Sequence, residues 1–140
     1  MSHKMPLLVL TLLYAVRMAV NVVHGRAHDM LEVPLAAWQN AFVWGVIVIA
    51  PSVVLIVLWF RTSRALAWAL AMLLAAGWLF GLFFHFGPAN PDHVSAVPDL
   101  PGHDLFAQTA VALAFVEPAT VLAAVWLARS LEKTMGAEHV

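Results

Sequence analysis

The sequence predicts an all-α integral membrane protein, a bundle of four transmembrane helices in a single domain that covers residues 1–140. Two observations carry this prediction. Apolar residues make up 63% of the chain and charged residues only 11%, whereas an ordinary soluble domain holds about 25% charged residues. Four stretches are also long enough to cross a bilayer core of roughly 30 Å, which takes about 20 helical residues. A soluble domain this small has too little interior to bury that much apolar surface.

The predicted spans are approximately residues 5–25, 41–60, 65–86 and 104–128. Ser52 is the only polar side chain in the second, and the indole nitrogens of Trp68 and Trp78 are the only polar groups in most of the third. The first span carries Arg17 and the fourth carries Glu117. Helices that lie on a membrane surface usually carry many Lys and Arg residues on one face. The first and fourth segments do not, so we assign them as spans that face a polar bundle interior.

The positive charges predict the orientation of the bundle. Basic residues flank the spans on one side of the predicted membrane, at Lys4, Arg61, Arg64, Arg129 and Lys133. Arg26 is the only basic residue in the other two loops. Because cytoplasmic loops carry the excess of Lys and Arg, we expect an N-in, C-in topology. The expected location is the cytoplasmic membrane of a bacterium or archaeon, with multiple passes.

Prolines are expected to interrupt regular structure at two places in the second half of the chain. The outer loop between the third and fourth spans contains four prolines and two glycines, which exclude a long regular helix there. Within the fourth span, Pro118 disfavours the helical conformation at Glu117 and leaves a carbonyl one turn earlier without its N–H partner. A kink at this point would make room for water or a ligand.

Residue content excludes several function classes. The formal net charge of −1 leaves no basic surface for phosphates, so no nucleic-acid partner is expected. The chain has no cysteine, which excludes disulfides, thiolate metal sites, iron–sulfur clusters and thiol catalysis. Any metal must therefore be held by histidine, carboxylate, methionine or a macrocycle.

A polar stripe runs along the first span. It comprises Tyr14, Arg17, Asn21, His24 and His28. These side chains are spaced three or four residues apart and fall within about 80° of one another on a helix. A charge at the bilayer centre costs about 2.5–3.5 kcal/mol, so Arg17 is expected to face protein and to pair with Glu117. The pair would either fix the first span against the fourth or act as a proton relay or a substrate-orienting pair.

Five of the seven histidines fall in the predicted outer segments, at His24, His28, His85, His93 and His103. The other two, His3 and His139, lie near the termini. His24 and His28 are four residues apart, so both imidazoles can reach one ion from the same face of a helix. These five residues are the candidate metal ligands.

Carboxylates lie on the same side of the predicted membrane, at Asp29, Asp92 and Asp104. They are alternative ligands or partners that orient the imidazoles. Imidazole and carboxylate donors without thiolate suit copper, iron or zinc. The structural alternative is that the histidines only cap helix ends or respond to pH.

Three functions stay open on the sequence, and all of them place the chain in a lipid bilayer. The first is a metal site at the extracytoplasmic face, used for redox or other metal-dependent chemistry near the membrane surface, as in a metal-dependent oxidoreductase. The second is a b-type haem electron-transfer protein with His24 and either His85 or His103 as axial ligands; it resembles four-helix membrane cytochromes in architecture. The third is a non-catalytic subunit of a larger membrane complex, or a homo-oligomer, docked through the face of Gly77 and Gly81.

Overall fold

The computed structural model describes residues 3–88 and 90–137 of the chain, and every regular element in these residues is a helix. His139 lies outside the described residues. The elements are α1 (Lys4–Leu31), α2 (Ala37–Phe42), the π-helix η1 (Val43–Ile49), α3 (Ala50–Phe60), α4 (Arg64–Phe86) and α5 (His103–Ala137). Because α2, η1 and α3 follow one another without a break, the structure contains four helical stretches long and apolar enough to cross a membrane.

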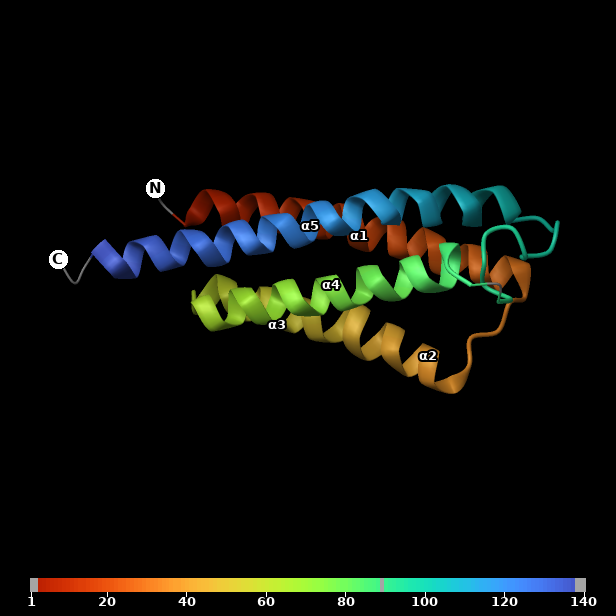
Figure 1. Cartoon of the computed structure of the whole chain (residues 1–140), viewed down its shortest axis with the longest axis horizontal. Coiled ribbons are helices and arrows are strands. Elements are labelled where there is room, and N and C mark those ends of the chain that lie inside the picture. The colour runs from red at the N-terminus through yellow and green to blue at the C-terminus, as the bar shows by residue number, and fades with distance from the viewer. Residues whose placement is uncertain (1–2, 89, 138–140) are drawn as a thin grey trace.

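The four stretches run side by side along one axis (Figure 1). Helix α1 begins and α5 ends at the same end of the bundle, which we call the terminal end. The opposite end, where α1 and α4 end and α5 begins, is called the histidine end below. Helix α5 packs along both α1 and α4, and the α2–η1–α3 stretch packs mainly against α4. The second stretch therefore lies at the edge of the bundle.

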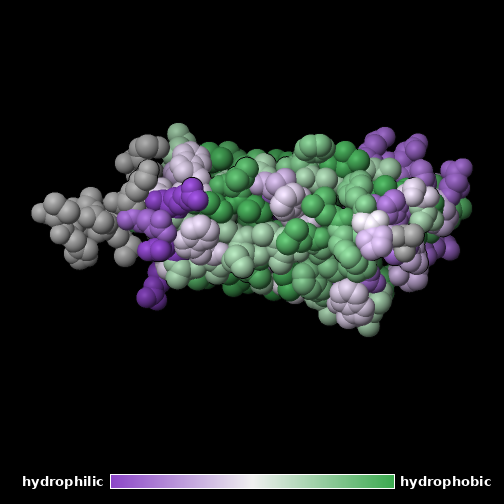
Figure 2. Space-filling view, in the orientation of Figure 1, coloured by the Kyte–Doolittle hydropathy of each residue, from purple (hydrophilic) through white to green (hydrophobic). Residues whose placement is uncertain are grey.

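The side surface of the bundle is apolar. A broad apolar band covers its middle and polar residues gather at its two ends (Figure 2). Large apolar side chains point outward from all four stretches, for example Leu12, Ile56, Met72 and Phe115. A soluble protein rarely exposes so large an apolar area, whereas lipid chains would cover this band in a bilayer. The apolar helices thus indicate contact with lipid.

Side chains fill the two halves of the bundle differently. The terminal half is closed by a hydrophobic core that includes Leu10, Leu58, Leu70 and Leu127, each with no exposed surface. The histidine end has a smaller core, formed by Ala27, Leu31, Val97 and Phe106. Arg17, Asn21 and His24 of α1 lie between the core residues Tyr14 and Ala27 along that helix, so these polar groups have apolar packing on both sides along the axis.

The π-helix η1 precedes Pro51, a residue with no backbone N–H to donate to the carbonyl of Ile47 one turn earlier. Bonding in this segment shifts to longer spacing, since the N–H of Ala50 donates to the carbonyl of Gly45. The carbonyl of Ile47 instead accepts a hydrogen bond from Nη1 of Arg17 at 3.1 Å. Pro51 thus supplies a backbone acceptor to a charged side chain on another helix.

The loop of residues 87–102 is tied to the histidine end by hydrogen bonds to the last turn of α4. The N–H of Val94 donates to the carbonyl of His85 at 3.0 Å, and Nδ2 of Asn90 donates to the carbonyl of Phe84 at 3.0 Å. Gly102 closes the loop with a φ of 110°, and a Cβ there would lie 2.9 Å from Cβ of Met30. These contacts place Asp92 over the end of the bundle.

Candidate metal centre

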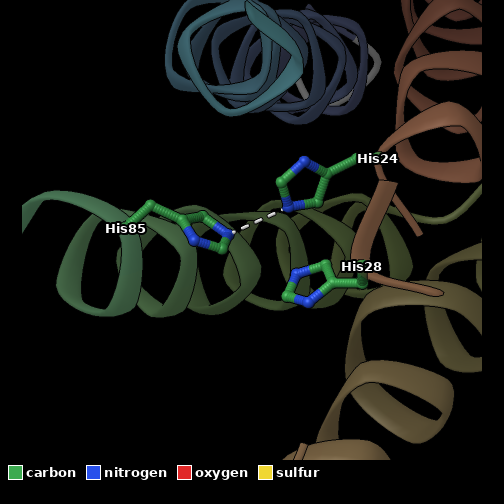
Figure 3. Close-up of side chains that lie close together, drawn as sticks. All are labelled: His24, His28 and His85. Carbon is green, nitrogen blue, oxygen red and sulfur yellow. Dashed lines mark hydrogen bonds between the residues drawn. The ribbon is translucent and has the colours of Figure 1, made fainter. Parts of the chain in front are cut away.

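Three of the predicted ligands, His24, His28 and His85, come together at the histidine end (Figure 3). His24 and His28 lie one turn apart on α1, and His85 lies in the last turn of α4. Each offers a ring nitrogen, and the three nitrogens lie within 4.8 Å of one another. This spacing lets one ion contact all three. Within residues 3–88 and 90–137, no other set of three or more such side chains meets this condition.

The hydroxyl of Thr109, on α5, determines which ring nitrogen of His24 carries the proton. Oγ1 of Thr109 lies 2.6 Å from the carbonyl oxygen of Leu105. A carbonyl has no proton to give, so the hydroxyl donates to it. The same Oγ1 lies 2.9 Å from Nδ1 of His24. Because the hydroxyl proton is already used, Nδ1 of His24 is the donor in that contact, and Nε2 of the neutral ring is left with a free lone pair.

Asp92 has the same effect on His85. Nδ1 of His85 lies 3.1 Å from the backbone carbonyl oxygen of Asp92, which can only accept. One carboxylate oxygen of Asp92 lies a further 3.6 Å from this nitrogen. Nδ1 of His85 therefore carries the ring proton, and Nε2 of His85 also holds a free lone pair.

The two unprotonated Nε2 atoms of His24 and His85 face each other at 3.2 Å (Figure 3). Two lone pairs at this distance repel unless a cation lies between them, either an added proton or a metal ion. Two imidazole nitrogens bound at 2.0–2.1 Å to one tetrahedral zinc ion lie about 3.3 Å apart. The third histidine beside them favours a metal ion, because a proton bridges only two nitrogens whereas a metal ion binds three or more.

His28 lies beside the carboxylate of Asp92. Its Nε2 lies 3.4 Å from Oδ1 of Asp92, and its Nδ1 is buried without a hydrogen-bond partner. Asp92 is itself only 5% exposed. Burial raises the pKa of the Asp92 carboxyl from 3.8 to about 7, so this group exchanges a proton near neutral pH. Asp92 thus contacts two of the three histidines and orients both.

Phe106 forms an apolar wall against the three imidazoles. Its ring centroid lies 4.9 Å from those of His24 and His28 and 5.3 Å from that of His85. The Phe106 side chain is fully buried. Apolar packing of this kind restricts rotation of the imidazoles and excludes water from one side of the group.

The other predicted site residues at this end lie apart from the group of three. Nδ1 of His93 accepts hydrogen bonds from the N–H and hydroxyl of Ser95. His103 pairs with the exposed Asp104 at 3.5 Å. Asp29 pairs with Arg26 at 4.0 Å on the surface. We therefore leave His93, His103, Asp29 and Asp104 out of the candidate centre.

Two side chains of the centre were not among the predicted site residues, namely Thr109 and Phe106. Both lie in the first two turns of α5 and are three residues apart, so they share one face of that helix. Thr109 and its neighbour Gln108 are polar residues early in the fourth span, and this polarity could have indicated a contact with the histidines. The sequence alone does not reveal which face of α5 meets α1.

Replacing Asp92 by asparagine is expected to lower the affinity for Zn²⁺ by about 10–100-fold, the usual effect of losing a carboxylate that orients metal-binding histidines. The backbone carbonyl of residue 92 remains, so His85 keeps one of its contacts. Competition with a chromophoric chelator measures the affinity. Asp104→Asn is the matched control, because that side chain is 94% exposed and contacts only His103. Equal affinities of the two variants would show that Asp92 does not support the centre.

Below the histidines, the polar stripe of α1 faces the bundle interior. Nη2 of Arg17 lies 3.2 Å from Oε1 of Glu117, the partner expected from the sequence, and the two side chains are 0% and 6% exposed. Asn21 donates to the carbonyl of Arg17 at 3.0 Å. The hydroxyl of Tyr14 lies 2.8 Å from Oγ of Ser52. The stripe thus connects α1 with α5 and with the second helical stretch.

Gly77 on α4 makes room for the ion pair. A Cβ at this position would lie 3.3 Å from Nη2 of Arg17 and 3.7 Å from Oε2 of Glu117. At Gly81, one turn further along α4, the nearest atom to an added Cβ is 3.9 Å away, in His85. Gly77 therefore allows a buried ion pair to fit beside the helix.

The variant Gly77→Leu is expected to unfold more readily than Gly81→Leu. A leucine at residue 77 has to displace the buried guanidinium, and overpacking of this kind costs about 1–3 kcal/mol. Both variants gain similar helix propensity, so their difference isolates the contact with the ion pair. Thermal unfolding in detergent measures it. A Gly77→Leu protein at least as stable as Gly81→Leu would contradict the packing described here.

A cavity of about 860 Å³ extends from the histidines to the ion pair. Its lining includes His24, His28 and His85 at one end and Glu117 at the other. His24 and Arg17 are seven residues apart on α1, so the two ends are separated by about 10 Å along the axis. A ligand in this cavity would contact both polar groups or the space between them.

No protein-family model matches the chain, and no curated protein or solved structure is detectably similar to it. The geometry of the histidines and the cavity is therefore the basis for a functional proposal.

Proposed function

We propose that this protein binds one transition metal ion in the membrane through His24, His28 and His85. The observation that carries the proposal is the 3.2 Å separation of Nε2 of His24 and Nε2 of His85. The ring proton of His24 is on Nδ1, which donates to Thr109. The ring proton of His85 is on Nδ1, which donates to the carbonyl of Asp92. Hydrogen bonds of this kind are the usual means by which proteins orient metal-binding histidines.

Three neutral imidazoles suit copper, iron or zinc. A site with three protein ligands keeps an open position, which is typical of catalytic rather than structural zinc. The ion would therefore be able to bind and activate a further molecule, with redox chemistry available if it is copper or iron. Metal-dependent chemistry near the membrane surface is the function that these residues support best.

The same spacing favours a single ion over a haem. Axial ligands of a haem approach the iron from opposite faces of a flat macrocycle. The distance between the two Nε2 atoms is shorter than two metal–imidazole bonds of about 2 Å each. The ring of His28 also stands only 4.9 Å from that of His24. A macrocycle would have to displace these side chains.

The proposal places the metal at the extracytoplasmic face. Lys4, Arg61 and Arg64 belong to the terminal end, opposite the histidines. An excess of basic residues marks the cytoplasmic side of a membrane protein. The metal would therefore exchange with the outer aqueous phase.

The elemental content of untagged, detergent-purified protein tests the proposal. We expect about one copper, iron or zinc ion per chain, removed by a strong chelator and restored by adding the metal salt. The control is His3→Ala, whose side chain lies at the other end of the chain's first helix. Protein that stays folded, holds no metal and binds none on titration would refute the proposal.

A further inference from the structure

The cavity below the histidines opens sideways between α1 and η1. Val22 on α1 and Trp44 on η1 both line it, and they are 69% and 57% exposed. Gly25 also lines it, and a Cβ added there would meet nothing within 4 Å. Val22 and Trp44 belong to the apolar side surface, whereas the exposed Arg26, Asp29 and Glu32 line the cavity nearer the histidine end. A molecule dissolved in the membrane can therefore enter without crossing water.

Unpartnered polar groups lie in the walls of this cavity. Oε2 of Glu117 is buried and accepts no hydrogen bond of good geometry, although the Asn21 side chain interacts with this carboxylate, and Oε1 lies 3.2 Å from Nη2 of Arg17. Nε1 of Trp78, whose side chain also lines the cavity, is buried without a partner as well. Buried polar groups are nearly always hydrogen-bonded in native proteins. Below the histidines, one acceptor and one donor are thus available to a molecule that occupies the cavity, while Nδ1 of His28 and Oδ1 of Asp92 lack hydrogen-bond partners at the histidine end.

A hydroxyl group is complementary to both kinds of atom, since it donates one hydrogen bond and accepts others. Several walls of the cavity are aromatic, including Trp44, Trp78, Phe80 and Phe86. Aromatic walls favour a flat ring, which packs face-on or edge-on against them. Aliphatic side chains such as Ile47, Val48 and Leu113 also line the cavity, together with polar side chains that include Asn21 and Asn40.

We propose that the cavity binds a lipid-soluble phenol or hydroquinone, with its ring between the aromatic walls and a hydroxyl that donates to Glu117. Trp78 donates to the oxygen of the ligand. The tail leaves through the opening beside Gly25 into the lipid. The Arg17–Glu117 pair at the lower end of this cavity lies about 10 Å from the histidines. Binding of the ligand therefore does not depend on a metal ion, and this inference is independent of the proposed metal site.

Binding of tritiated decylubiquinol in a scintillation proximity assay, with a chelator present throughout, tests this inference. We expect saturable binding of about one molecule per chain. The dimethyl ether of the probe, which has lost both hydroxyls, is expected to compete at least tenfold more weakly. Trp78→Phe keeps the ring and removes the N–H, and should weaken binding about fivefold, the effect of one neutral hydrogen bond.

The opening is tested by a matched pair of variants. Gly25→Phe places a large side chain at the opening and should weaken or slow binding at least tenfold. Gly45→Phe is the control, because an added Cβ at residue 45 also meets nothing within 4 Å but this residue does not line the cavity. Its binding should match that of the unmodified protein.

Three results would overturn the inference. One is the absence of saturable binding, which would indicate that the cavity holds water and not a hydroquinone. Another is equal binding of the hydroquinone and its dimethyl ether, which would show that no hydroxyl is recognised. The third is binding that appears only when the chelator is omitted and metal is added, which would place the ligand on the metal instead and leave the metal proposal intact.

Discussion

Replacing His24 by alanine is expected to lower the affinity for Zn²⁺ by more than about 100-fold, beyond the 10–100-fold effect of losing an orienting partner. His24 supplies one of the two nitrogens that face each other at 3.2 Å. Without it, only His28 and His85 remain to bind the ion, and the pair of nitrogens with the shortest separation is lost. His85→Ala should have the same effect for the same reason. Chelator competition measures both affinities.

His93→Ala and His103→Ala serve as controls, since both side chains lie outside the group of three. They should bind Zn²⁺ as tightly as the unmodified protein. Thermal unfolding without metal checks that each variant is folded. Added Zn²⁺ at about 100 times its Kd should stabilise the unmodified protein by about 2.7 kcal/mol, and His24→Ala by less than about 0.4 kcal/mol at the same concentration. Equal losses of affinity in all four variants would contradict the assignment of the ligands.

Glu117→Gln is expected to lower the free energy of unfolding by about 3–5 kcal/mol, the usual cost of leaving a buried charge without its partner. The glutamine has nearly the same volume, so packing is preserved. Arg17 has no exposed surface, and its remaining contacts are the carbonyl of Ile47 and neutral neighbours. Unfolding by SDS in mixed micelles measures the change.

Glu132→Gln is the matched control for that variant. Glu132 pairs with Arg64 at 2.9 Å, but these side chains are 36% and 54% exposed. Exposed pairs contribute about 0–1 kcal/mol, so this variant should be nearly as stable as the unmodified protein. The double variant Arg17→Met/Glu117→Gln should regain most of the lost stability, because it removes the unpaired charge. If Glu117→Gln and Glu132→Gln unfold alike, the buried pair has no structural role.

The spans and the ion pair could be predicted because the bilayer makes polar groups conspicuous. Arg17 and Glu117 are the two charges deep in predicted spans, and a single charge in lipid is costly. The pairing of Arg17 with Glu117 could be predicted from the cost of an unpaired charge in lipid alone, without knowledge of how the helices pack. The spacing of His24 and His28 likewise depends only on the period of one helix.

The membership of the candidate centre could not be predicted, because it depends on how separate helices are rotated and how a loop folds. His93 and His85 are both near the end of α4, yet the loop brings Asp92 over His28 and His85 while His93 bonds to Ser95. His103 begins α5 three residues before Phe106 but pairs there with the exposed Asp104 instead of joining the group of three. Tertiary contacts decide which histidines and carboxylates join the centre, and such contacts leave no periodic signal in the sequence.

The role of Ile47 was also missed, although a signal for it was present. Pro51 stands within an apolar span, where its missing N–H frees the carbonyl four residues earlier. That carbonyl accepts a hydrogen bond from Arg17. A proline in a membrane helix therefore predicts a free backbone acceptor nearby, and the nearest buried donor is the side chain to test.

The measurement that tests the metal centre most directly is the X-ray absorption fine structure of the protein loaded with one equivalent of Zn²⁺. Three imidazole ligands are predicted, with zinc–nitrogen distances of about 2.0–2.1 Å and the outer-shell scattering that imidazole rings produce. Loss of one imidazole from this pattern is expected in His24→Ala. A spectrum with only oxygen neighbours, or one that His24→Ala leaves unchanged, would contradict binding by His24, His28 and His85.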